Sequence, residues 1–139
     1  MHSKEEFLDF IEKEISKNNL IIVEGKKDFD SLIKIGFSKK NIFVLNNGKP
    51  FITNIEEIES LSDKRKCKTQ EKQDFSGPRK FRKFSRVSIL TDFDKKGKML
   101  YAKIKENLLH KEKIDDSLRL QILKQKISHI EGLYSYLNA

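Results

Sequence analysis

The hydrophobic positions of this chain alternate between short continuous runs and stripes with helical spacing. The runs at 20–23, 42–45 and 87–90 are rich in Leu, Ile, Val and Phe, which is typical of strands covered on both faces. Between them, apolar residues recur every three or four positions over 7–15, 28–35, 51–61 and 96–109, a spacing that predicts helices. A last stripe over 118–137 predicts one long helix or two broken ones, and Ile114 is a candidate for a short edge strand. The alternation predicts an α/β domain, with a mainly parallel central sheet and helices on both faces.

Length and composition narrow the class of protein further. The chain has 139 residues, 37% of them hydrophobic and 36% charged, so we expect a single domain over 1–139. No apolar run approaches the length of a membrane span, and the first ten residues, MHSKEEFLDF, lack the apolar centre of a secretory signal. Cys67 is the only cysteine, which excludes an internal disulfide and fits a reducing compartment. We therefore expect a cytoplasmic protein that does not contact membranes.

The excess positive charge is confined to one segment. Residues 64–86 contain ten basic and two acidic side chains, whereas the rest of the chain has 19 of each and is neutral. We interpret 62–86 as a basic insertion in the domain. A concentrated cationic strip attracts nucleic acids by neutralising phosphates and releasing counterions. The alternative is a solvated loop whose charge only promotes solubility.

Aromatic residues in the basic insertion strengthen the interpretation that it binds nucleic acid. Phe75, Phe81 and Phe84 alternate with a set of four basic residues, namely Arg79, Lys80, Arg82 and Lys83. Aromatic rings stack on unpaired bases while neighbouring cations hold the backbone. The alternative is that these phenylalanines only anchor the segment to the domain.

Acidic residues follow two of the expected strands directly. Glu24 follows the run at 20–23, and Asp92 and Asp94 follow the run at 87–90. The carboxyl ends of parallel strands are where open α/β sheets bind ligands. If the two strands are neighbours, three carboxylates converge there and repel one another unless a cation lies between them. Hard oxygen ligands suit Mg²⁺, with Mn²⁺ as the alternative.

Competing interpretations of this pattern were weighed. Asp92 and Asp94 with Gly97 resemble the start of an EF-hand loop, but Lys96 and Lys103 occupy positions where that loop needs oxygen ligands. The two aspartates could also be an ordinary turn or helix-cap pair. Gly25, like Gly97, could be a plain turn glycine.

Two motifs resemble those of Toprim domains. Residues 22–28, Ile-Val-Glu-Gly-Lys-Lys-Asp, resemble the first Toprim motif, a strand that ends in a glutamate, and 90–97, Leu-Thr-Asp-Phe-Asp-Lys-Lys-Gly, resemble the second, the DxD pair with its glycine. Toprim domains occur in topoisomerases, bacterial-type primases, some DNA nucleases and nucleases that mature ribosomal RNA. The resemblance covers about 20–109. The chain length and the segment Ile-Glu-Gly-Leu at 130–133 are most similar to the small stand-alone Toprim proteins of archaea.

The resemblance implies roles for individual residues. Glu24 would act as a general acid or base, or as a metal ligand. Asp92 and Asp94 would hold one or two Mg²⁺ ions. All three would be catalytic residues. A set of lysines beside the motifs would contact the substrate phosphate, namely Lys26, Lys27 and Lys96, although solvated first turns of helices would look the same. Gly25 and Gly97 would serve as structural glycines.

The leading hypothesis is an Mg²⁺-dependent nuclease acting on structured RNA or DNA. The alternative is a non-catalytic metal- and nucleic-acid-binding subunit of a processing complex, in which a partner protein supplies the choice of substrate. His129 lies in an apolar stripe and is expected to be structural rather than a proton shuttle. Cys67 has no base partner in the pattern. The tyrosines are expected to be core or surface aromatics.

Overall fold

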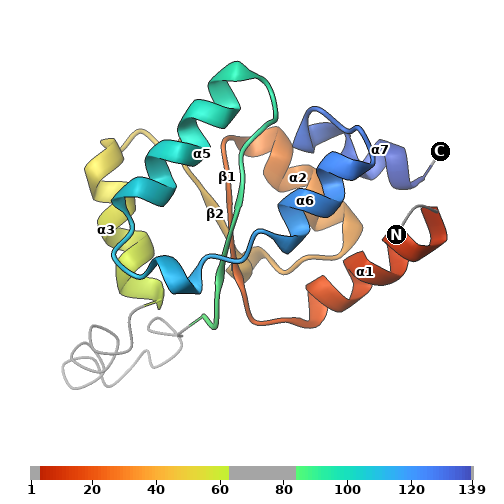
Figure 1. Ribbon diagram of the computed structural model, residues 1–139, viewed down its shortest axis with the longest axis horizontal. Coiled ribbons are helices and arrows are strands. Elements are labelled where there is room, and N and C mark those ends of the chain that lie inside the picture. The colour runs from red at the N-terminus through yellow and green to blue at the C-terminus, as the bar shows by residue number, and fades with distance from the viewer. Residues whose placement is uncertain (1–3, 63–83, 139) are drawn as a thin grey trace.

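Three parallel strands form the centre of the fold, as the hydrophobic pattern predicts (Figure 1). The computed structural model describes residues 4–62 and 84–138. The strands are β1 (Leu20–Val23), β2 (Ile42–Val44) and β3 (Val87–Leu90), and their order in the sheet is β2-β1-β3. The two strands that carry the acidic motifs, β1 and β3, are therefore neighbours.

Helices connect and cover the strands. They are α1 (Lys4–Ser16), α2 (Lys26–Ile35), α3 (Phe51–Ser62), α5 (Lys95–Asn107), α6 (Ser117–Lys124) and α7 (Leu133–Leu137), with single 3-10 turns at η1 (Lys39–Asn41), η3 (Lys111–Lys113) and η4 (Ile130–Gly132). The last apolar stripe forms two broken helices. The break follows α6, where Lys126 takes a left-handed φ of 61° that a helix cannot continue.

The central strand divides the hydrophobic core into two clusters. All four residues of β1 are buried, and successive side chains point to opposite faces of a sheet. Ile21 and Val23 pack into a cluster with residues of α1, α2, α6 and α7, while Leu20 and Ile22 pack into a second cluster with residues of α3 and α5. Figure 1 shows these two groups of helices on opposite sides of the strands. Both faces are covered, which confirms the predicted α/β class.

Of the two outer strands, β3 is fully buried as expected, whereas β2 is not. The residues of β2 are only half-buried, and β2 has a neighbouring strand on one side alone among the described elements. Ile114 forms a single parallel bridge to Val87 rather than a strand. The next residue, Asp115, donates its backbone N–H to the Val87 oxygen at 2.8 Å. This hydrogen bond satisfies the backbone oxygen of the first residue of β3 on the side that has no neighbouring strand among the described residues.

The described residues at the carboxyl end of the expected basic insertion attach at the end of the sheet opposite to the acidic motifs. Phe84 donates a backbone hydrogen bond to Leu61 of α3, and Ser85 donates one to Asn18, just before β1. Both attachments lie at the amino ends of β1 and β3, whereas the acidic motifs follow the carboxyl ends. Arg79, Lys80, Arg82, Lys83 and Cys67 lie outside the described residues. Among the described helices, none has the length and apolar character needed to cross a membrane.

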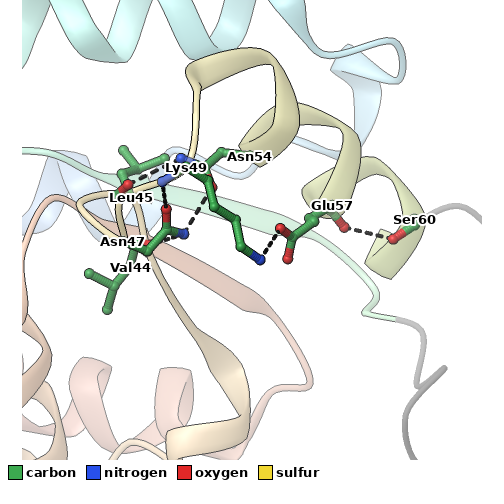
Figure 2. A network of polar contacts seen from close by, with 7 residues as sticks. All are labelled: Val44, Leu45, Asn47, Lys49, Asn54, Glu57 and Ser60. Atoms are coloured by element: carbon green, nitrogen blue, oxygen red, sulfur yellow. Dashed lines mark hydrogen bonds and ion pairs between the residues drawn. The ribbon is translucent and has the colours of Figure 1, made fainter.

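A polar network holds the loop that follows β2 (Figure 2). The buried side chain of Asn54, on α3, donates to the Leu45 oxygen at 3.1 Å and accepts from Asn47 Nδ2 at 2.9 Å. Asn47 Nδ2 also donates to the Val44 oxygen at 3.1 Å. The network satisfies backbone oxygens at the carboxyl end of β2 and attaches α3 to that end of the sheet.

We expect Asn54→Ala to lower the free energy of unfolding by about 1–3 kcal/mol, because it leaves a buried carbonyl without its donor. Urea denaturation at neutral pH measures this loss. Asn107→Ala is the matched control, since the exposed Asn107 side chain only caps a carbonyl of its own helix and its loss should change stability much less. Equal effects of the two substitutions would contradict the role assigned to Asn54.

Candidate functional site

The parallel pairing of β1 with β3 brings the acidic motifs together. Val23 is paired with Leu90 in the register of the two strands, so Glu24 and the residues after Leu90 leave the sheet side by side. The Glu24 carboxylate then accepts the backbone N–H of Asp92 at 2.8 Å through Oε2. The three residues that the motifs single out therefore belong to one constellation.

Each aspartate of the DxD pair uses one oxygen for structure. Asp92 Oδ1 accepts the backbone N–H of Ile130 at 2.9 Å. Asp94 Oδ1 accepts the N–H of Gly97 at 2.7 Å and caps the amino end of α5, so the helix-cap interpretation holds for this oxygen. Within the described ranges, the second oxygen of each carboxylate accepts no hydrogen bond. Both second oxygens therefore remain for a ligand.

His129 belongs to this constellation, contrary to the expectation of a structural residue on a helix face. It lies in the loop between α6 and η4, half-exposed, with Nε2 at 3.7 Å from Asp94 Oδ2. Its Nδ1 lies 2.9 Å from the Ser128 hydroxyl, and this contact orients the ring. One ligand atom from each of Asp92, Asp94 and His129 lies within 4.8 Å of the others. Glu24 is outside that group, so the donor set differs from the one that the motifs imply.

Backbone hydrogen bonds attach the His129 loop to the DxD loop. Phe93 donates its N–H to the Ser128 oxygen at 3.0 Å, and the bond from Ile130 to Asp92 follows on the other side of His129. These two hydrogen bonds join residues that are 35 and 38 positions apart in sequence. No local pattern therefore reveals that His129 reaches the site.

Arg119, on α6, holds the start of the DxD loop through hydrogen bonds to backbone oxygens. The sequence motifs do not include it. Its buried guanidinium donates from Nη1 to the backbone oxygens of Ile89, at 3.3 Å, and Thr91, at 2.7 Å. These carbonyls lie on and just after β3, on the edge that has no neighbouring strand among the described residues. An arginine inside the apolar stripe of α6 is the signal that could have revealed it.

Two aromatic rings hold the Arg119 guanidinium. Its carbon lies 4.6 Å from the centre of the Phe93 ring and 4.4 Å from that of Tyr101. Burial lowers the pKa of Arg119, but arginine remains charged at any physiological pH. Tyr101 is thus a packing residue, as expected.

The two predicted structural glycines differ. A Cβ on Gly97 would lie 2.1 Å from the backbone oxygen of Asp92, whereas one on Gly25 would meet nothing within 4 Å. The Thr91 hydroxyl donates to the Gly97 oxygen at 2.7 Å and holds the two segments at this short separation. Gly97 is therefore required for α5 to approach the DxD turn, and Gly25 is not required for close packing.

A pocket of about 580 Å³ opens at the Glu24 and Asp92 side of the constellation, and Asp94 and His129 are not among its lining residues. Its lining combines four acidic residues, Glu24, Asp28, Asp92 and Glu131, with four lysines, Lys26, Lys27, Lys49 and Lys96. Three of these lysines occupy the first turns of α2 and α5, where the helix dipole adds positive potential. All three lysines expected to contact phosphate therefore lie at the pocket. Acidic groups and cations thus line one cavity.

Lys49 joins the pocket from the loop after β2. The network in Figure 2 orients it: its N–H donates to Asn47 Oδ1 at 3.0 Å, and its ammonium pairs with Glu57 at 2.7 Å. No local pattern in the sequence singles out Lys49, because the residues that orient it belong to the loop after β2 and to α3.

Asp28 is a buried carboxyl in the wall of the pocket. It accepts the N–H of Gly25 at 3.1 Å as part of a capping box at the start of α2. Burial is the largest influence and raises the pKa of Asp28 to about 6. The hydrogen bond from Gly25 opposes this rise, and the negative charges of Asp92, Glu24 and Glu131 add to it. The acid three residues after Gly25 is a capping-box signal in the sequence. Its proximity to the other carboxylates is not visible there.

Comparison with known proteins gives two similar chains. The UPF0292 protein MJ1624 of Methanocaldococcus jannaschii is 29% identical over 140 residues, which cover 96% of this chain and 91% of that protein. A solved structure described as a protein from Aquifex aeolicus superposes with a TM-score of 0.62 at 25% identity and covers 94% of this chain and 98% of that one. No family model matches the sequence. Neither name states an activity, so the function has to be argued from the site.

We expect Gly97→Ala to lower the free energy of unfolding by about 1–3 kcal/mol or more, because the added methyl group collides with a backbone oxygen that cannot rotate away. Gly132→Ala is the control: a Cβ there meets nothing within 4 Å, and stability should be unchanged or slightly higher. Thermal and urea denaturation measure both variants. A tolerated Gly97→Ala would contradict the close approach of α5 to the DxD turn.

The raised pKa of Asp28 predicts a pH-dependent cost in stability. The folded protein holds the Asp28 proton up to about pH 6, whereas an unfolded aspartate loses it near pH 4. Stability from this group therefore falls as the pH rises from 4 to 6 and stays lower above that range. Asp28→Asn keeps an oxygen for Gly25 and has no proton to lose. Its free energy of unfolding relative to that of the wild type should therefore increase by on the order of 2 kcal/mol as the pH rises from 4 to 7.5.

Urea denaturation in EDTA across this pH range measures the difference between wild type and Asp28→Asn. Asp30→Asn, on the exposed side of the same helix, is the control. A difference that does not change with pH would contradict the assignment.

Proposed function

We propose that this chain is a Toprim-like protein that performs Mg²⁺-dependent phosphodiester chemistry on nucleic acid, as a nuclease acting on structured RNA or DNA. The observation that carries the proposal is the constellation at the carboxyl ends of β1 and β3. There Glu24 and Asp92 line one pocket with four lysines, and Asp94 lies beside Asp92 with its second oxygen unused by any hydrogen bond among the described residues. Carboxylates attract a metal ion and lysines attract phosphates, and a nucleic-acid phosphodiester is a substrate that needs both.

The donor atoms at the site fit a divalent cation. Asp92 and Asp94 each offer one oxygen, and His129 Nε2 lies within the same 4.8 Å group. Two carboxylates with room for water suit Mg²⁺, and the imidazole makes Mn²⁺ a second suitable ion. When bound, such an ion offsets negative charge that develops on the phosphate oxygens.

The residues of this chain have distinct parts in the proposed reaction. Lys26, Lys27 and Lys96 bind phosphate oxygens at the first turns of their helices. Glu24 keeps Oε2 on the backbone of Asp92 and presents its other oxygen as an acid or base for a proton on the attacking or leaving oxygen. Arg119 positions the DxD loop through its carbonyls and does not touch the substrate.

The proposal predicts that the protein cleaves nucleic acid only with a divalent metal ion and only when Asp92 is present. Wild type with Mg²⁺ or Mn²⁺ should cut labelled structured RNA or DNA, and EDTA should abolish cutting. Asp92→Asn should lower the rate by roughly a hundredfold or more, because it removes a charge that holds the metal. Asp9→Asn is the matched control, since Asp9 is an exposed residue of α1, and its rate should equal that of the wild type.

Full activity of Asp92→Asn, or cutting in EDTA, would contradict the nuclease proposal. Isothermal titration of Mn²⁺ into wild type and Asp92→Asn separates the alternatives. Metal binding and nucleic-acid binding without any cleavage would favour the second hypothesis, a non-catalytic subunit whose partner supplies the chemistry.

A further inference from the structure

A second surface depression lies along α5, next to the carboxylate pocket. It has a volume of about 570 Å³ and is lined by Lys95, Lys96, Met99, Leu100 and Lys103. We call this depression the α5 groove. These residues recur along one face of the helix, and the apolar ones form its floor. Met99 and Leu100 are two of the apolar positions of the helix that the sequence predicts over 96–109.

The floor of the α5 groove is unusually exposed for apolar residues. Met99 keeps 65% of its surface accessible, whereas Ile104 on the same helix is fully buried. At the far end, the Lys103 ammonium lies 4.3 Å from the centre of the Phe51 ring on α3. The groove thus reaches the helix on the other side of the pocket.

The α5 groove is continuous with the carboxylate pocket. Lys96 and Leu100 line both depressions, and Phe51, which contacts Lys103, lines the pocket as well. A polymer whose phosphate lies at Asp92 in the pocket therefore has a path out along α5.

The lysines that line the α5 groove indicate which kind of ligand it binds. Three of its five lining residues are lysines, and none is acidic, so it complements a polyanion. Its apolar floor suits the faces of unpaired bases, and cations beside such a floor hold the strand's backbone. In a double helix the base faces are stacked on one another, so they are not free to pack on the apolar residues of the groove. A protein partner is less suitable, because lysine is depleted in the buried centres of protein interfaces.

We propose that the α5 groove binds an unpaired nucleic-acid strand adjoining the phosphate in the carboxylate pocket. This inference rests on the proposed function and deepens it, since it states that the substrate strand enters single-stranded. Bases lie on Met99 and Leu100, and Lys95 and Lys103 bind phosphates on either side. Structured RNA or DNA then binds through an unpaired segment.

Binding measured without cleavage tests the proposal. Fluorescence anisotropy in EDTA compares a labelled single-stranded oligonucleotide with a blunt duplex of the same sequence. Met99→Glu puts a negative charge on the floor and should weaken single-strand binding roughly tenfold or more, with little effect on the duplex. Leu123→Glu is the matched control: it makes the same charge change at an exposed leucine of α6. Lys103→Gln should lower the salt slope of single-strand binding by about 0.7.

Each outcome decides the proposal. A selective loss of single-strand binding in Met99→Glu, with Leu123→Glu unchanged, supports the α5 groove. Equal losses for single strand and duplex, no loss, or no single-strand binding by the wild type would overturn it. A wild-type dimer that Met99→Glu dissociates in sedimentation would overturn it too, because a second copy of the chain would then be the occupant.

Cleavage assays with Mg²⁺ keep this test separate from that of the proposed function. Metal-dependent cutting with no selective effect of Met99→Glu leaves the nuclease proposal standing without the α5 groove. Single-strand binding that depends on Met99 but leads to no cutting leaves the groove standing without the nuclease.

Discussion

The parallel pairing of β1 with β3 is the constraint on which the rest of the site depends. It aligns Val23 with Leu90, and the chain therefore leaves both strands at one level. Glu24 can then accept the N–H of Asp92, which fixes the DxD loop relative to the central strand. A shift of one residue in this register would turn the side chains of a buried strand to the opposite faces. The two hydrophobic clusters on either side of β1 oppose such a shift.

The strand β3 lies at the edge of the described sheet, and side chains replace the missing neighbour. Asp115 satisfies the first exposed carbonyl of β3, and Arg119 satisfies those of Ile89 and Thr91. A buried cation is costly unless it is paired with acceptors. Here the acceptors are backbone oxygens, and two aromatic rings lie against the guanidinium. The edge of the sheet is thereby closed directly beneath the candidate metal ligands.

Charge is distributed differently in space than along the chain. The sequence concentrates the net positive charge in residues 64–86, and the neutral remainder offers no reason to expect a cationic surface there. Folding nevertheless gathers Lys26, Lys27, Lys49 and Lys96 around the carboxylates. Four acidic residues line the same pocket. The candidate phosphate contacts therefore come from the part of the chain that is neutral overall.

The sequence by itself determined the three strands, the α/β class and the positions of Glu24, Asp92 and Asp94 at strand ends. These features depend on local patterns, namely continuous apolar runs and the residues that follow them. The sequence also indicated Gly97 as a structural glycine. It did not show the reason, which is that a Cβ at this position would lie 2.1 Å from the backbone oxygen of Asp92. Helix and strand identity follow from neighbours in the chain.

Only the tertiary structure decided which residues complete the site. His129 and Arg119 reach it through contacts with segments far away in sequence. Lys49 is oriented by Asn47 and Glu57, which are close to it in sequence but belong to the loop after β2 and to α3. The break after α6 turns His129 toward Asp94 instead of leaving it on a helix face. Strand order and the path of a loop across the sheet are set by packing between distant segments, and a single sequence carries no local periodicity that encodes them.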